Sequence, residues 1–186
     1  SPRRKELLAL AGFNFTVCPA KGEEVTTKTL PCDIVCELAH QKAFEIAKAQ
    51  KAPCYVIGAD TIVAFENRIL GKPKDSADAV RMVSMLQGST HQVYTGVTLI
   101  EVCADGSLRE KSFYEETNVH VCQMTKDEIA SYVATGEPLD KAGAYGIQGT
   151  FSIYVSGIEG DYFNVVGLPV SRLYHEFAAF QNAAHK

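Results

Sequence analysis

Asp60 is the one carboxylate in an otherwise apolar stretch of the chain. Segment 54–65 reads CYVIGADTIVAF and contains ten apolar or glycine positions. A carboxylate buried in such a setting is costly unless a cation or several hydrogen-bond donors compensate it. Asp60 therefore either ends a strand and caps a turn, or lies at a strand end in a cleft, where it holds a metal ion or activates water. The acidic pair Glu23 and Glu24 is solvated surface unless the fold brings it near Asp60, where two carboxylates could share a divalent cation with phosphate oxygens.

Lys42 occupies a position where a helix should be apolar. Val35, Leu38 and Ile46 follow the 3.6-residue period of a helix predicted over residues 33–50, and Lys42 falls on the same face. Its ammonium either reaches back to the surface or points into a site that carries negative charge.

Further basic groups stand at positions that suit an anion. Ser1, Arg3 and Arg4 open a predicted helix, whose free amides and partial positive charge favour a phosphate, and the two arginines add forked donors. Lys72 is held extended by the proline that follows it. Segment 137–149, EPLDKAGAYGIQG, places three glycines within seven residues, and such a loop lets its backbone approach a ligand closely. The polar residues beside these glycines are Asp140, Lys141 and Gln148.

The composition excludes several other functions. The net charge is −4, from 18 Lys and Arg against 22 Asp and Glu, which argues against a broad nucleic-acid surface. No apolar run approaches the ~20 residues of a membrane helix, and we expect no secretory leader. Six scattered cysteines without a CxxC pair predict reduced thiols in a cytoplasmic compartment, not zinc or disulfides. Since no serine–histidine or cysteine–histidine arrangement is apparent, metal-assisted attack of water on a phosphate chain fits better than covalent catalysis.

Helix and strand patterns alternate along the chain, which predicts an α/β fold with a mixed, twisted sheet flanked by helices. Asp33 and Ser76 are predicted helix N-caps, and Thr125 with Glu128 forms a capping box. The predicted helices cover residues 3–11, 33–50, 76–88, 125–136 and 170–184. The predicted strands cover residues 13–17, 54–65, 91–102, 108–121, 151–155 and 162–166.

These clusters together resemble one family, the Maf-type nucleoside triphosphate pyrophosphatases. The combination of GADT, GKP and DKAGAYGIQG is highly specific, and the matching stretches run in family order across essentially the whole chain. The resemblance implies a single Maf-like domain over residues 1–186. The family pattern begins with a short strand that ends just before SPRR, so we expect a piece of chain upstream of Ser1. The matching stretches are SPRRKELL (1–8), EE (23–24), LAHQKA (38–43), VIGADTIV (56–63), LGKP (70–73), HQVYTGV (91–97), EPLDKAGAYGIQG (137–149) and GDYFNVVGLP (160–169).

The resemblance implies hydrolysis of a nucleoside triphosphate between its α and β phosphates, assisted by Mg²⁺ or Mn²⁺. By position, Asp60 matches the family's acidic catalytic residue, either as proton acceptor or as metal ligand. Glu23 matches the family's second acidic residue, which is also implied as a metal ligand. Lys42 and Lys72 match the catalytic lysines that line the phosphates. The remaining substrate-binding residues implied are Ser1, Arg3, Arg4, Thr61, Asp140, Lys141 and Gln148.

Three of those positions imply which base is selected. Arg3, Thr61 and Gln148 are similar to the branch that acts on dTTP and UTP, whereas the branch that prefers 7-methyl-GTP carries different residues there. The alternatives are the same chemistry on 7-methyl-GTP or a deaminated purine nucleotide, or a non-catalytic nucleotide-binding regulator of cell division. The family also implies two lobes around a cleft, as in the inosine triphosphate pyrophosphatases, and a homodimer without nucleic-acid or membrane partners.

Overall fold

The computed structural model describes residues 1–51 and 53–183, which form two compact units. The first unit takes its described residues from Ser1–Thr61, Thr95–Glu115 and the segment from Gly167 onward. The second unit takes Ile62–Tyr94 and Glu116–Val166. Within the described residues, no helix is long and apolar enough to cross a membrane.

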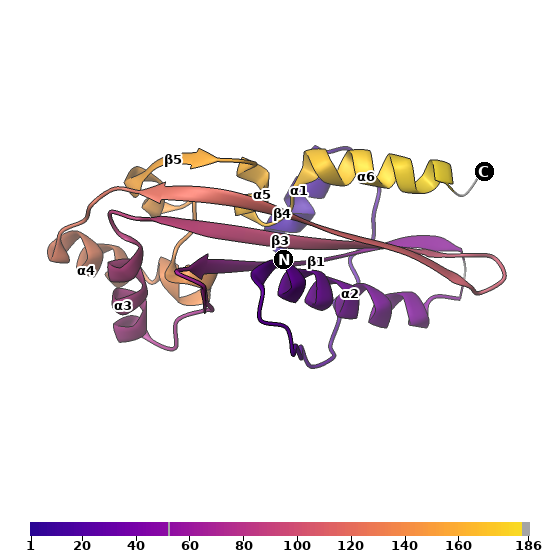
Figure 1. Cartoon of the computed structure of the whole chain (residues 1–186), viewed down its shortest axis with the longest axis horizontal. Coiled ribbons are helices and arrows are strands. Elements are labelled where there is room, and N and C mark those ends of the chain that lie inside the picture. Colours follow the sequence, from indigo (N-terminus) through magenta and orange to yellow (C-terminus); the bar gives the residue numbers. More distant parts are fainter. Residues whose placement is uncertain (52, 184–186) are drawn as a thin grey trace. The chain divides into compact units, whose positions relative to one another are not determined.

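A five-stranded sheet has the strand order β2-β1-β3-β4-β5 (Figure 1). Strand β2 pairs with β1 and β5 with β4, both antiparallel. Strands β3 and β4 form the predicted hairpin, closed by a 2.9 Å bond from the Cys103 N–H to the Ser107 carbonyl. The predicted α/β class with a helix-flanked sheet is confirmed, but the sheet is antiparallel where we expected parallel pairs as well. The strands are β1 (Cys54–Phe65), β2 (Arg68–Leu70), β3 (Thr90–Val102), β4 (Leu108–Val121) and β5 (Val155–Glu159).

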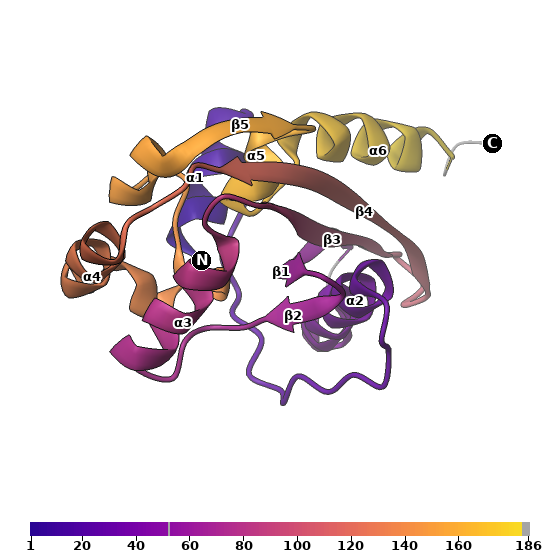
Figure 2. The same cartoon turned by 60° about the vertical axis from the view of Figure 1, so that its left-hand side comes forward.

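In the first unit, helices cover both faces of the sheet (Figure 2). These helices are α1 (Pro2–Leu10), α2 (Pro31–Ala49) and α6 (Val170–Asn182). Helix α2 packs Ala43 and Ala47 on Val56 of β1. Helix α6 places Phe177 against Tyr55, with ring centroids 5.1 Å apart. Because neighbouring strand residues point to opposite faces, α2 and α6 lie on opposite sides of β1.

The second unit surrounds its own apolar core. Phe151, Leu86, Val93 and Val119 lie at its centre and are almost fully buried. The α-helices of this unit are α3 (Ser76–Leu86), α4 (Lys126–Ala134) and α5 (Tyr162–Val166). Its 3-10 helices are η1 (Glu137–Asp140), η2 (Ala142–Ala144) and η3 (Thr150–Tyr154).

Three predicted strands are wrong. Residues 13–17 have no regular structure, and residues 151–155 lie mostly in the 3-10 helix η3. Residues 162–166 are helical because Asp161 starts a helical turn. Its carboxylate accepts the Phe163 N–H at 2.7 Å, and its carbonyl accepts the Val165 N–H. Strands β2 and β5 were not predicted. Strand β2 has only three residues and β5 contains a glycine, so neither shows a clear alternation of apolar and polar residues.

The helix boundaries are close to those predicted, with different caps. The capping box of Thr125 and Glu128 is confirmed. Asp75, not Ser76, caps α3 by accepting the Asp78 N–H at 2.8 Å. Asp33 lies inside the first turn of α2, because Pro31 begins that helix. The predicted end of the last helix at residue 184 falls outside the described residues.

His91 gives the second unit a pH-dependent stability. The imidazole is fully buried, and its Nε2 lies 2.7 Å from the Tyr145 hydroxyl. Burial and, to a smaller extent, the nearby His120 together lower the pKa of His91 to about 4. Since the unfolded state then binds the proton more readily, stability is complete above pH 6.5 and is lost as the pH falls toward 4.

We therefore expect the free energy of unfolding to fall by up to about 3 kcal/mol between pH 7 and pH 4. Urea titrations across this range measure it. His91→Gln has no group that titrates there, so its stability should vary less with pH; an unchanged slope would contradict the assignment.

Candidate active site

Two glycines bring helix α2 directly onto the strands of the first unit. A Cβ at Gly58 would lie 2.4 Å from the Ala39 carbonyl oxygen, and one at Gly96 would lie 2.3 Å from the Val35 backbone. No larger residue fits at either position. The close approach places Lys42, on the next turn of α2, over the strand position two residues after Gly58.

That position is Asp60, and the two anomalous residues of the sequence form an ion pair. Lys42 Nζ lies 2.6 Å from Asp60 Oδ1 and 2.9 Å from Glu24 Oε1. Asp60 is only 8% exposed. The ammonium compensates the buried carboxylate and holds a second carboxylate beside it, so three charged groups meet at one point.

Helix α2 also anchors the acidic segment. Glu45 accepts the backbone N–H groups of Lys21 and Gly22 at 2.9 and 3.0 Å, and Gln41 accepts the Val25 N–H at 3.3 Å. These backbone N–H donors lower the pKa of the Glu45 carboxyl. Gln41 and Glu45 lie on either side of Lys42 along the helix, so their bonds to the acidic segment hold Glu24 within reach of the Lys42 ammonium.

Arg4 approaches the middle of β1 from the opposite face of the sheet, at Thr61. The expectation that Asp60 lies at a strand end is wrong, because β1 continues from Asp60 to Phe65. Its Nε donates to the Gly167 carbonyl at 2.9 Å, and its Nη2 donates to the Thr61 hydroxyl at 2.9 Å. Burial lowers the pKa of the Arg4 guanidinium, while Asp60 and Glu24 act in the other direction. Thr61 faces Arg4 and Asp60 faces Lys42, because the two residues are neighbours on one strand.

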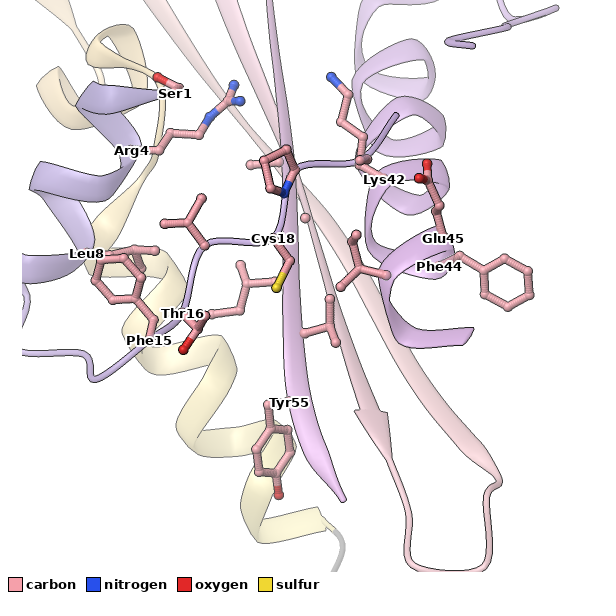
Figure 3. Close-up of a pocket in the computed structure, with 18 of the residues that line it drawn as sticks. Ser1, Arg4, Leu8, Phe15, Thr16, Cys18, Lys42, Phe44, Glu45 and Tyr55 are labelled. Carbon is pink, nitrogen blue, oxygen red and sulfur yellow. The ribbon is translucent and has the colours of Figure 1, made fainter. Parts of the chain in front are cut away.

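A cavity of about 1610 Å³ opens in this unit. Figure 3 shows Arg4 and Lys42 extending toward the same end of it, from α1 and α2. Its lining includes Ser1, Arg4, Glu23, Glu24 and Lys42, whereas Asp60 is not among the described lining residues. Arg3, half-buried on the same helix as Arg4, is not among the described lining residues. The rest of the lining includes apolar side chains such as Leu8, Phe15 and Tyr55.

The second unit carries the remaining predicted residues. The Gly143 N–H donates to the Gly71 carbonyl at 3.0 Å and so ties the glycine-rich segment to the residue before Lys72. Gly143 has φ of 69°, and a Cβ there would lie 2.9 Å from the Val63 side chain, which explains the glycine. Lys141 Nζ donates to Asp140 Oδ1 at 2.6 Å and to the Glu137 carbonyl at 2.8 Å.

Lys72, Asp140 and Gln148 are exposed in this unit, while Lys141 is half-buried. The backbone bond and the glycine give these residues a defined local arrangement. Their roles stay predictions.

Comparisons with known proteins identify the family. The family model for Maf-like proteins matches residues 1–180. The chain belongs to the Maf-like protein family. Of its relatives, a dTTP/UTP pyrophosphatase of Agathobacter rectalis is 55% identical over 188 residues, covering 95% of this chain and 92% of the relative. The dTTP/UTP pyrophosphatases of Lachnoclostridium phytofermentans and Bacillus cytotoxicus are 51% and 50% identical, covering 97% and 99% of this chain and 91% and 94% of their own lengths.

Two contacts at the site of this Maf-like protein were not predicted from its sequence. Glu24, not Glu23, contacts Lys42, and Thr95 contacts Thr61. The acidic pair was visible, but a sequence does not show which of two neighbouring loop residues turns inward. Gln41 and Glu45 could have been noticed in the sequence, because these two polar residues stand one helical turn apart on either side of Lys42.

The donor set of this Maf-like protein fits a magnesium-type cation that binds together with phosphate. Among the described residues, no group of three or more His, Cys, Asp or Glu side chains is placed to hold a metal ion. Two carboxylates, Asp60 and Glu24, do meet at Lys42. Mg²⁺ is commonly held by one or two carboxylates, with substrate phosphates and water completing its shell.

Proposed function

We propose that this chain is a nucleoside triphosphate pyrophosphatase that hydrolyses dTTP and UTP to the monophosphate and pyrophosphate. The observation that carries the proposal is the group of Asp60, Glu24 and Lys42 beside a large cavity. This group occurs in a chain of the Maf-like family. Relatives that match the chain over nearly their whole length are named dTTP/UTP pyrophosphatases.

Substrate binding begins with charge. A nucleoside triphosphate carries about four negative charges near neutrality, so several cations must meet it. Lys42 and Arg4 line the cavity and supply two of them. A guanidinium offers five N–H donors, and Arg4 gives two of them to Gly167 and Thr61, which leaves three for phosphate oxygens.

In the hydrolytic step, a water molecule attacks the α-phosphorus and the bond to the oxygen bridging the α and β phosphates breaks. Asp60 accepts the proton of that water. Pyrophosphate leaves with the bridging oxygen, and the Lys42 ammonium stabilises the charge that builds on it. The nucleoside monophosphate keeps the oxygen that came from water.

Asp60 and Glu24 would hold the divalent cation, Mg²⁺ or Mn²⁺, that belongs to the proposal. When bound, such a cation supplies charge stabilisation to phosphoryl oxygens. Glu23 lines the same cavity and is the residue that the family resemblance implies as a metal ligand.

The base would be selected by Arg3, Thr61 and Gln148, the positions that the resemblance implies. The Gln148 amide both donates and accepts, which suits a pyrimidine edge with its carbonyl and ring N–H. Lys72, Asp140 and Lys141 would contribute to binding the substrate. A homodimer and a cytoplasmic location complete the proposal.

A product assay across a panel of nucleotides tests the function. Purified protein is incubated with dTTP, UTP, 7-methyl-GTP and ITP, each with Mg²⁺, with Mn²⁺ and with a chelator. We expect pyrophosphate and the monophosphate from dTTP and UTP only when a divalent cation is present. Preference for a purine nucleotide would overturn the substrate, and release of inorganic phosphate in place of pyrophosphate would overturn the reaction.

The acidic pair offers a second test within this proposal. Because Glu24 contacts Lys42, Glu24→Gln should lower kcat/KM for dTTP about tenfold more than Glu23→Gln. Both substitutions remove one charge from adjacent cavity-lining residues, so each is the other's control. A larger effect of Glu23→Gln would favour the assignment that the family resemblance implies.

A further inference from the structure

Arg4 is held by two fixed acceptors. The Gly167 carbonyl accepts from Nε and the Thr61 hydroxyl from Nη2, each at 2.9 Å. Two bonds to different nitrogens fix both the position and the plane of a guanidinium. The orientation of the Arg4 side chain therefore depends on whether the Thr61 hydroxyl itself is oriented.

Thr95 is a hydrogen-bond partner of that hydroxyl. The two hydroxyl oxygens of Thr61 and Thr95 lie 2.9 Å apart, and Thr95 is fully buried on the neighbouring strand β3. A hydroxyl has one proton to donate and two lone pairs. When Thr61 gives its proton to Thr95, a lone pair turns toward Arg4; the Gly167 carbonyl, 3.4 Å away, is a poorer second acceptor.

We propose that Thr95 is a positioning residue for the Arg4 guanidinium, acting through the Thr61 hydroxyl. The proposal rests on the proposed function, in which Arg4 binds the triphosphate. Thr95 has no part in the chemical step. Its hydroxyl keeps a long, flexible side chain in its binding orientation before the substrate arrives, so less rotamer freedom is lost on binding.

The variant Thr95→Val tests this, because valine keeps the shape and removes the hydroxyl. We expect the Kd of the non-hydrolysable α,β-methylene analogue of dTTP, measured by calorimetry, to rise about fivefold, the effect of one buried hydrogen bond. The kcat for dTTP should stay within about twofold, because the interaction supports binding in ground state and transition state alike. Thr95→Ser keeps the hydroxyl and should bind the analogue nearly as the wild type does.

Thr98→Val is the matched control. Thr98 is also a fully buried threonine of β3, and its hydroxyl lies 2.8 Å from the Ser112 hydroxyl, with no part in the Arg4 network. This variant loses the same kind of hydroxyl pair, so analogue binding should not change. An equal loss of affinity in Thr98→Val and Thr95→Val would show a general effect on the strand and overturn the proposal.

A double-mutant cycle isolates the path through Arg4. In an Arg4→Ala background, Thr95→Val should change the Kd less than twofold, because nothing remains to be positioned. If the fivefold effect persists there, Thr95 does not act through Arg4.

Arginine Nε–H exchange, observed by NMR in the wild-type protein, requires neither folding of a variant nor a nucleotide. The Arg4 signal should exchange with water much more slowly than that of Arg3 on the same helix. Equal exchange rates would overturn the positioning role even if the protein hydrolyses dTTP. Slow Arg4 exchange in a wild type that neither binds nor cleaves dTTP would instead overturn the proposed function alone.

Discussion

Replacing Asp60 by asparagine is expected to lower kcat for pyrophosphate release from dTTP by about a thousandfold. Asparagine has nearly the same shape, but its amide accepts no proton from water and carries no charge for a cation. The loss should appear in kcat, because proton transfer belongs to the transition state. Steady-state assays with a coupled pyrophosphate readout measure it.

The fold should survive this change. Lys42 keeps its contact with Glu24 and is partly solvated, so the substitution does not strand a fully buried cation. Circular dichroism and a thermal melt of Asp60→Asn check this point. Asp127→Asn removes an exposed carboxylate from the first turn of α4 and should leave kcat unchanged. If Asp60→Asn retained the full rate in a folded protein, Asp60 would be neither the proton acceptor nor an essential metal ligand.

Replacing Lys42 by methionine is expected to lower kcat/KM for dTTP by about a hundredfold. Methionine retains a linear stem of similar length, so it removes the ammonium with little change in packing. Without that charge, Asp60 and Glu24 face each other with no cation between them, and the leaving pyrophosphate loses a stabilising partner. Initial rates over a range of dTTP concentrations, at saturating Mg²⁺, separate the effects on kcat and KM.

A second ion pair of the first unit gives the control for Lys42. Lys111 contacts Glu176 at 2.5 Å and lies outside the proposed site. Lys111→Met removes one surface charge of the same kind, and such pairs contribute little to stability. Its kcat/KM should equal that of the wild type. A comparable loss in both variants would mean that net charge, and not the position of Lys42, governs activity.

Asp60 and Lys42 could be recognised from the sequence because their anomaly is local. A carboxylate within an apolar strand and a lysine on the apolar face of a helix each need a partner, and each partner proved to be the other. The capping box of α4, the hairpin of β3 and β4 and the family itself were equally accessible, since motifs and turn signals lie within short stretches.

The strand predictions failed where apolar composition was the only guide. Phe151 belongs to the 3-10 helix η3, and its fully buried ring packs against Tyr145 and Tyr132, with centroids 4.8 and 5.0 Å away. The same run of apolar residues would also suit a strand, and only the packing of the second unit distinguishes the two.

The sequence by itself determined the family, the α/β class and the charged residue types that a phosphate site requires. Only the tertiary structure decided which of two adjacent glutamates contacts Lys42, and that a threonine on β3 supports Arg4 through Thr61. The physical reason is that burial and periodicity leave traces within a few residues along the chain. A contact between a loop, a helix and two strands depends instead on the distances between those elements in the folded chain, and no local sequence pattern gives these distances.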